Sequence, residues 1–303
     1  MERLENKKQV KKGMILAGGL GTRFLPATLC LAKELFPIGN MPIMMYHIQD
    51  LVKAGVDDIL IVGNKLKEES FKNFLTPSKE YLDKIESDGK MAMLEKFNDL
   101  MSKVKITYVN QDDVRFNYDG EEYENTALGE RGSAIAINAG KDWAKDEPFV
   151  VLNGDDLCFY LDGKSMTQEV INIYQATDDI VVYGKELPRE VMYKYSSMVL
   201  GEEVANGRGA KMLDIIEKPA VGTEPSNIMG FCRYILNAEF FDRIFKVTPR
   251  PNGEYNMTDV LQNLAKDGLV SMCLFTGTYF DCGSENGYAS ANMFVVEHKE
   301  ELK

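Results

Sequence analysis

Three glycines within four positions, directly after a short apolar run, constrain this chain more than any other feature of its sequence. The run at residues 13–17 has the length and character of a buried β-strand, and the glycines fall within residues 18–21. Glycine adopts positive φ without steric cost and lets a ligand approach the backbone closely. Successive N–H groups in such a loop form an anion-binding concavity, and Arg23 and Lys33 add positive charge beyond it. The stretch predicts a polyphosphate site, although a bare GGxG also fits a glycine-rich turn without a ligand.

The two common phosphate-binding motifs do not match this stretch. Nothing fits the Walker A pattern GxxxxGK[ST], and the dinucleotide fingerprint GxGxxG fails because Phe24 occupies the third glycine position. The loop therefore indicates a polyphosphate site of another kind.

The overall charge excludes two classes of partner. The chain of 303 residues carries 35 lysines and arginines against 47 acidic residues, a formal net charge of −12, and no basic stripe offsets it. Binding to nucleic acid or to an anionic membrane is therefore not expected. No apolar run reaches the roughly 20 residues of a membrane span, and residues 1–12 lack the apolar core of a signal peptide.

Cysteine and histidine usage limits the chemistry further. Five cysteines without a CxxC pair indicate reduced, mostly buried thiols and a cytoplasmic protein. Only two histidines exist, so a histidine-rich zinc site is nearly excluded. His47 falls on the amphipathic pattern of residues 42–54, where we expect packing or a solvent-facing position rather than catalysis.

Apolar strands alternate with amphipathic helices along the chain. This alternation predicts a Rossmann-like, three-layer α/β fold with a mainly parallel, mixed central sheet and helices on both faces. One continuous domain is expected, with a nucleotide-binding half at about 12–160 and an acceptor half with a closing helix at about 161–303. We expect solvated helices from the charged residues 65–103 and a loop or lid from the acidic stretch 112–131. Strands are expected at 13–17, 58–62, 105–109, 148–156, 179–183, 198–199, 211–216, 228–236, 269–275 and 278–281, and helices at 42–54, 132–144, 238–245, 257–267 and from 284 onward.

Polar residues follow several of these strands. Gln111 lies just past one, Asp155 and Asp156 end another, and Asp281 ends the last. Ligands of parallel α/β sheets bind outside the carboxyl ends of the strands, so the glycine loop, Gln111 and Asp155 are expected to meet there. Carboxylates without nearby histidine or cysteine suit Mg²⁺ rather than zinc. An isolated aspartate, however, also commonly serves as a turn or helix cap.

The longer string GGLGTRFLPAT…KELFP, within residues 18–37, resembles the signature GGxGTRLxPxT…PKxLxP of the sugar-phosphate nucleotidylyltransferases. Its FLPAT segment is most similar to the bacterial UTP–glucose-1-phosphate uridylyltransferases. Five later segments resemble the same family in order: GD at 154–155, EKP at 217–219, PSN at 225–227, GEYNMTD at 253–259 and DCGS at 281–284. The resemblance extends from about residue 12 to about residue 296.

This resemblance implies an enzyme that transfers a uridylyl group from UTP to a sugar-1-phosphate, most closely glucose-1-phosphate, and releases pyrophosphate. It implies Mg²⁺ as the cofactor, held by Asp155 and Asp281, with Asp156 an adjacent candidate, and a homo-oligomer (dimer or tetramer). The other family roles fall on the catalytic residues Arg23, Lys33 and Lys218, on the nucleotide-binding residues Ala17, Gly18, Gly19, Gly21, Thr22, Gln111 and Gly132, and on the sugar-phosphate-binding residues Glu217, Lys218, Asn227 and Ser196.

Three positions depart from the family pattern. Ala32 replaces the proline that normally precedes the lysine. Ser133 follows Gly132 where the uridylyltransferases have GLGHA, and Ser196-Ser197 stands at their YG step. Because the last two lie near the expected base and sugar pockets, CTP or dTTP, or another phosphate or phosphonate acceptor, is an alternative. A non-catalytic nucleotide-binding relative is the alternative from another class.

Overall fold

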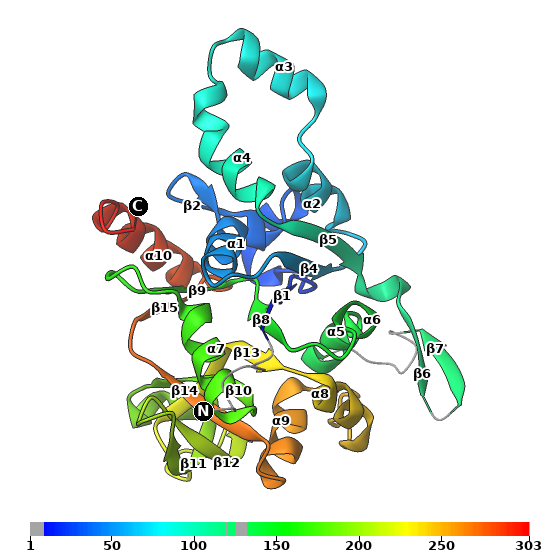
Figure 1. Cartoon of the computed structure of the whole chain (residues 1–303), viewed down its shortest axis with the longest axis vertical. Helices are drawn as coiled ribbons and strands as arrows, with labels where there is room; N and C mark the ends of the chain where they lie inside the picture. The colour runs from blue at the N-terminus through cyan, green and yellow to red at the C-terminus, as the bar shows by residue number, and fades with distance from the viewer. Residues whose placement is uncertain (1–8, 119, 125–131, 303) are drawn as a thin grey trace, which may run out of the picture.

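The computed structural model describes residues 9–118, 120–124 and 132–302, and its main feature is a mixed β-sheet. Nine strands are hydrogen-bonded in the order β11-β12-β14-β10-β13-β8-β1-β4-β5 (Figure 1). They are β1 (Lys12–Leu16), β4 (Asp58–Gly63), β5 (Lys105–Asn110), β8 (Phe149–Asn153), β10 (Ile180–Glu186), β11 (Ser196–Val204), β12 (Gly209–Glu217), β13 (Ile228–Leu236) and β14 (Val270–Phe275).

Parallel pairing is concentrated in the N-terminal half of this sheet. β1 lies parallel to β4 and β8, and β4 lies parallel to β5. Beyond β8, only β10 and β14 pair in parallel, while β13 runs antiparallel to both β8 and β10, and β12 to both β11 and β14. The prediction of a mixed α/β sheet is confirmed, and its parallel part is the half that carries the glycine loop.

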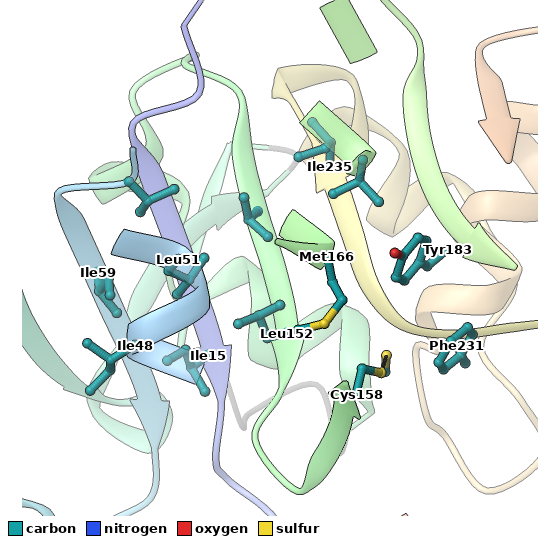
Figure 2. Packing of buried hydrophobic residues seen from close by; sticks show 14 of the residues in the cluster. Ile15, Ile48, Leu51, Ile59, Leu152, Cys158, Met166, Tyr183, Phe231 and Ile235 are labelled. Atoms are coloured by element: carbon teal, nitrogen blue, oxygen red, sulfur yellow. Dashed lines mark hydrogen bonds between the residues drawn. The ribbon is translucent and has the colours of Figure 1, made fainter. Parts of the chain in front are cut away.

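Helices cover both faces of the sheet, as predicted. One face packs against α1 (Ile43–Lys53) and α7 (Met166–Thr177), whose apolar residues join Ile15, Ile59 and Leu152 in one core cluster (Figure 2). The other face packs against α5 (Ser133–Asn138), α6 (Lys141–Ala144), α8 (Ala238–Arg243) and α9 (Met257–Lys266). Strands buried on both faces are apolar almost throughout, which explains why the sequence of β4 reads as the continuous run ILIV.

The charged segment 65–103 forms helices, as predicted: α2 (Glu68–Leu75), α3 (Lys79–Ser87) and α4 (Glu95–Ser102). The last two form an arm that projects from the body (Figure 1). The expectation that all charges of this segment are solvated is wrong for Lys67, which is buried. None of the helices in the described part of the chain is long and apolar enough to cross a membrane.

Among the elements that were not anticipated from the sequence are α7 and β9 (Asp156–Phe159). β9 pairs antiparallel with β15 (Thr278–Asp281), so that Asp156 lies opposite Asp281. α10 (Glu285–Glu297) follows and packs next to this ribbon (Figure 1). The short strands β2 (Pro37–Ile38) and β3 (Met41–Pro42) form a separate pair.

The acidic stretch 112–131 contains a β-hairpin rather than a loop or lid. β6 (Arg115–Tyr118) pairs with β7 (Glu121–Glu124), while residues 119 and 125–131 lie outside the described residues. Arg115 forms ion pairs with Glu122 and Glu124 across the hairpin. Phe116 stacks on Phe245 with ring centroids 4.9 Å apart, which ties the hairpin to the body. β6 alternates polar and aromatic residues (RFNY) over four residues only, and β7 (EEYE) contains a single aromatic residue, so the strand signal in this stretch is short.

Candidate active site

The carboxyl ends of the four parallel strands β8, β1, β4 and β5 carry the candidate site. The glycine loop follows β1, Asn64 follows β4, Gln111 follows β5 and Asp155 follows β8. Asn64 Nδ2 donates to the Gly18 carbonyl at 2.6 Å. A Cβ at Gly18 would lie 2.8 Å from Gln111 Oε1, so a larger residue there would displace the Gln111 amide from the loop. The structure thus brings the glycine loop and Gln111 together.

Lys33 lies along the glycine loop. Gly21 has φ +69° and begins a 3₁₀ turn at Thr22–Phe24, and Thr28 Oγ1 donates to its carbonyl at 3.1 Å. A Cβ at Gly19 would lie 3.7 Å from Lys33 Nζ. The lysine ammonium group therefore faces the loop, where polyphosphate is expected.

The Lys33 ammonium group forms an ion pair with Asp155 Oδ2. Burial alone would lower the pKa of Lys33, but the Asp155 and Glu34 carboxylates together outweigh burial, and the pKa lies above its usual value. The lysine accordingly stays protonated at neutral pH and provides a permanent positive charge.

Ala32 has the backbone conformation of a proline, with φ −60° and ψ 135°. Because proline fixes φ near −65°, Ala32→Pro is expected to raise the free energy of unfolding by about 0.4–1 kcal/mol by restricting the unfolded chain. Activity should stay within about twofold. Chemical denaturation together with a pyrophosphate-release assay checks both, with Ala32→Gly as the control that shifts stability the other way. Loss of activity in Ala32→Pro with UTP binding intact would mean that the loop takes another path and that Lys33 is misassigned.

Asp155 and Asp281 lie side by side against Gly283. A Cβ at Gly283 would collide with Asp155 Oδ2 and would lie 3.0 Å from Asp281 Oδ1 and 3.2 Å from Arg23 Nη2. Arg23 Nη1 is 3.5 Å from Asp281 Oδ2. Two carboxylates and two cations thus meet beside the glycine loop, although they come from distant parts of the sequence.

Asp156 has a different environment from Asp155. Its carboxylate accepts hydrogen bonds from Tyr279 at 2.7 Å and from Asn153 Nδ2 at 2.8 Å. Burial and the neighbouring Asp155 charge raise the pKa of Asp156 to about 7. These contacts hold Asp156 within its own strand pair, whereas Asp155 and Asp281 face the cations.

The donor set of this site fits a hard divalent cation. Asp155 and Asp281 offer only oxygen ligands. Among the described residues, no group of three or more histidine, cysteine or acidic side chains has a metal-binding arrangement. Two carboxylates therefore suit an ion that completes its shell with water and substrate phosphates, as Mg²⁺ does.

A buried ion pair between Lys67 and Glu34 contacts the start of the glycine loop, and it was not predicted from the sequence. Lys67 Nζ lies 3.0 and 2.9 Å from the two carboxylate oxygens of Glu34, and it donates to the Ala17 carbonyl at 3.1 Å. Burial lowers the pKa of Lys67 and raises that of Glu34. No pattern marks Lys67 in the sequence, but Asn64 could have been found as a polar residue directly after an apolar strand, like Gln111.

Three of the predicted acceptor residues lie together at neighbouring ends of β11 and β12, and the fourth, Asn227, pairs with a residue of β10. Ser196 lies opposite Glu217 in the β11–β12 register, and the Lys218 N–H donates to Tyr195 O at 3.0 Å. Within the described residues, no hydrogen bond or ion pair of the Lys218 ammonium group is found. Asn227 Nδ2 instead donates to Glu186 at 2.9 Å, at the ends of β13 and β10.

Gly132 and the unusual Ser133 contact the start of α9. Gly132 has φ +117°, and a Cβ there would collide with the Tyr255 carbonyl. Ser133 Oγ accepts from the Met257 N–H at 2.9 Å and lies 3.2 Å from Asn256 Oδ1. The serine hydroxyl is therefore engaged with the amino terminus of α9.

The same helix contacts one of the predicted acceptor residues. Thr258 Oγ1 donates to Glu217 Oε2 at 3.3 Å, on the first turn of α9. The amino terminus of α9 thus connects the predicted nucleotide residue Gly132 with the predicted sugar residue Glu217.

Comparison with known proteins agrees with this geometry. The family model described as nucleotidyl transferase matches residues 12–298. A UTP–glucose-1-phosphate uridylyltransferase from Pseudomonas aeruginosa is 32% identical over 289 residues, covering 95% of this chain and 97% of the relative. A crystal structure of apo UDP-glucose pyrophosphorylase superposes with a TM-score of 0.83 at 28% identity, covering 96% of this chain and all of the other. A UDP-glucose pyrophosphorylase complexed with UDP-glucose gives 0.79 at 28% identity, covering 95% of this chain and 99% of the other.

The chain therefore belongs to the nucleotidyl transferase family, on the branch of the UTP–glucose-1-phosphate uridylyltransferases.

Proposed function

We propose that this enzyme transfers the uridylyl group of UTP to glucose-1-phosphate, giving UDP-glucose and pyrophosphate. The observation that carries the proposal is the cluster of Lys33, Asp155, Arg23 and Asp281 beside the glycine loop. A relative and a solved structure named for the same reaction support the choice of substrates.

The reaction requires charge neutralisation and alignment more than proton transfer. The attacking sugar phosphate has a second pKa near 6 and is largely dianionic at neutral pH, so it needs no general base. The protein has to bring two anions together in line and to stabilise charge that develops on the α-phosphate and the leaving pyrophosphate. Arg23, Lys33 and Lys218 are the catalytic cations in this proposal.

Mg²⁺ is the proposed cofactor, with Asp155 and Asp281 as its protein ligands. When bound, it would neutralise phosphate charge beside Lys33 and Arg23. Asp156 is not proposed as a ligand because Tyr279 and Asn153 already hydrogen-bond its carboxylate.

The nucleotide is proposed to lie along the loop. Backbone groups of residues 17–19, 21 and 22 would hold its phosphates and ribose, and Gly132 would lie near the base. Gln111 offers both a donor and an acceptor, as a pyrimidine edge requires. Glu217, Lys218, Asn227 and Ser196 would hold the sugar phosphate.

The direct test is turnover of defined substrates. UTP, glucose-1-phosphate and Mg²⁺ should yield pyrophosphate in a coupled assay and UDP-glucose by mass spectrometry. Parallel reactions with CTP or dTTP, and with other phosphate and phosphonate acceptors, measure the selectivity. Pyrophosphate release with another acceptor but never with glucose-1-phosphate would refute the substrate and leave only the reaction class. No release with any pair would favour a non-catalytic nucleotide-binding protein.

The two lysines should differ in their roles. Lys33→Ala is expected to lower kcat about a hundredfold with little change in UTP affinity, because its contact strengthens in the transition state. Lys218→Ala should raise the KM for glucose-1-phosphate and lower kcat about tenfold. Steady-state kinetics and calorimetric UTP binding distinguish these effects, with the exposed Lys164→Ala as the control. Identical kinetic defects in the two variants would contradict the assignment.

We further propose a single-domain cytoplasmic enzyme that works as a dimer or tetramer. Free thiols at all five cysteines, four of them buried, support a reducing compartment. On α10, Met293 and Val296 are 64% and 66% exposed, which supports contact with another copy. Light scattering after size-exclusion chromatography measures the oligomeric state.

A further inference from the structure

A buried histidine lies behind the turn that carries Asp155. His47, on α1, is 2% exposed, and its Nε2 lies 3.2 Å from the Gly154 carbonyl oxygen. A carbonyl can only accept a hydrogen bond, so the imidazole must donate from Nε2.

The ring is neutral when it makes this contact. Burial, helped by the nearby Arg233 guanidinium, lowers the pKa of His47 to about 4. A neutral imidazole carries one N–H, and the Gly154 carbonyl fixes that proton on Nε2. The histidine therefore anchors the turn without placing a positive charge behind the two carboxylates.

Gly154 is held through both its N–H and its carbonyl group. Its N–H donates to Leu16 O at 2.9 Å, at the end of the strand that leads into the glycine loop. A Cβ at Gly154 would lie 2.7 Å from that same oxygen and 2.9 Å from Glu34 Cγ. With Gly154 fixed between β1 and α1, the adjacent Asp155 has little freedom to shift.

α1 is itself anchored, which makes it a firm support for this contact. Asp50, one turn after His47, accepts hydrogen bonds from the Met166 and Thr167 N–H groups at 3.1 and 3.0 Å and from Thr167 Oγ1 at 2.6 Å. It also lies 3.4 Å from Arg233 of β13. The face of α1 that holds the catalytic turn is thus tied to α7 and β13.

We infer that His47 is a positioning residue for the transfer reaction: its Nε2–H fixes the Gly154 carbonyl and so orients the Asp155 carboxylate toward Lys33 and a divalent cation. The inference rests on the proposed function in assigning Asp155 to the ion. Partners one step removed from a metal ligand typically change metal affinity or activity 10–100-fold when they are lost. Because His47 acts on Asp155 through the neighbouring peptide, we expect an effect of about tenfold.

The experiment compares His47→Gln, whose amide N–H reaches nearly the position of Nε2, with His47→Met, which has similar bulk and no donor. His47→Met should raise the Mg²⁺ concentration for half-maximal rate about tenfold and lower kcat to a similar extent, and His47→Gln should restore most of both. Equal impairment of the two variants, or wild-type behaviour of both, would overturn the inference. If His47→Met does not fold, His47→Asn replaces it, because its shorter amide cannot reach Gly154.

Two readouts do not depend on turnover. Backbone hydrogen exchange at residues 153–157 should accelerate in His47→Met but not in His47→Gln, and Mn²⁺ binding followed by electron paramagnetic resonance should weaken in the same variant only. Unchanged exchange and Mn²⁺ binding in His47→Met would refute the positioning role. These measurements still test it if wild-type protein makes no UDP-glucose, so failure of the proposed function is recognised separately.

Discussion

Asp155→Asn is expected to lower kcat by about three orders of magnitude while the protein remains folded. The substitution keeps the shape of the side chain but removes the charge that pairs with Lys33 and that would hold the divalent cation. Loss of one preorganised electrostatic contact commonly costs 10²–10³ in rate. Lys33 would also lose the carboxylate that raises its pKa, so the positive charge of its ammonium group would be less strongly stabilised. Single-turnover kinetics and thermal unfolding of the same preparation measure rate and folding together.

Two further variants define the reach of this prediction. Asp281→Asn should cost at least about a hundredfold for the same reason, and higher Mg²⁺ should restore part of the rate if ion affinity is the main loss. Asp162→Asn removes an exposed carboxylate that pairs with Lys164, and its rate should equal that of the wild type. Full activity in Asp155→Asn would place the ion elsewhere, with Asp156 as the next candidate.

Of the substitutions proposed for this protein, Lys67→Met should lower the free energy of unfolding most, by about 3–5 kcal/mol. Breaking a buried ion pair by removing one partner leaves an uncompensated charge, here that of Glu34. Burial raises the pKa of Glu34, so as pH falls the folded state takes up a proton before the unfolded chain does. The deficit should therefore be largest at neutral and higher pH and should shrink in acid. Denaturation with guanidinium chloride at several pH values tests the prediction.

A double variant separates stability from function. Glu34→Gln/Lys67→Met carries no buried charge at this pair and should recover most of the stability. Both Lys67→Met and the double variant should have lower activity than the wild type, because both lack the contact with the Ala17 carbonyl. Lys72→Met removes an exposed helical pair with Glu68 and should change stability by less than about 0.5 kcal/mol. A loss below about 1 kcal/mol in Lys67→Met would contradict the importance of the buried pair.

The parts of the site that the sequence predicted are those that follow strands. Gln111 and Asp155 could be placed beside the glycine loop because the ends of parallel strands meet at one edge of a sheet. Lys33 and Asp281 required the family resemblance, since neither periodicity nor spacing brings them together. The structure pairs Lys33 with Asp155 and Asp281 with Arg23, and both contacts join residues more than a hundred positions apart in the chain.

The site contacts that the sequence did not predict are made by polar side chains that become buried only in the folded protein. Lys67 lies in a segment whose composition is typical of solvated helices, and only the structure shows that its ammonium group turns inward to Glu34. His47 was expected to pack or to face solvent, and it does pack, but its hydrogen bond to Gly154 has no local signal. β9 and α7 were missed although Ser165 accepts from the Gln168 N–H as a typical helix cap. The β6–β7 hairpin was missed because the alternation of polar and aromatic residues covers only the four residues of β6, and β7 contains a single aromatic residue.

The hairpin has a consequence for chain entropy. Twenty residues separate Gln111 from Gly132, and the entropic cost of closing a flexible connection grows only with the logarithm of its length, about 0.6 kcal/mol for each doubling. One aromatic pair such as Phe116 and Phe245 contributes about 0.5–1.5 kcal/mol, enough to offset a doubling. Extra chain between Gln111 and Gly132 is therefore nearly neutral for folding, and its length can vary without loosening the residues at its two ends.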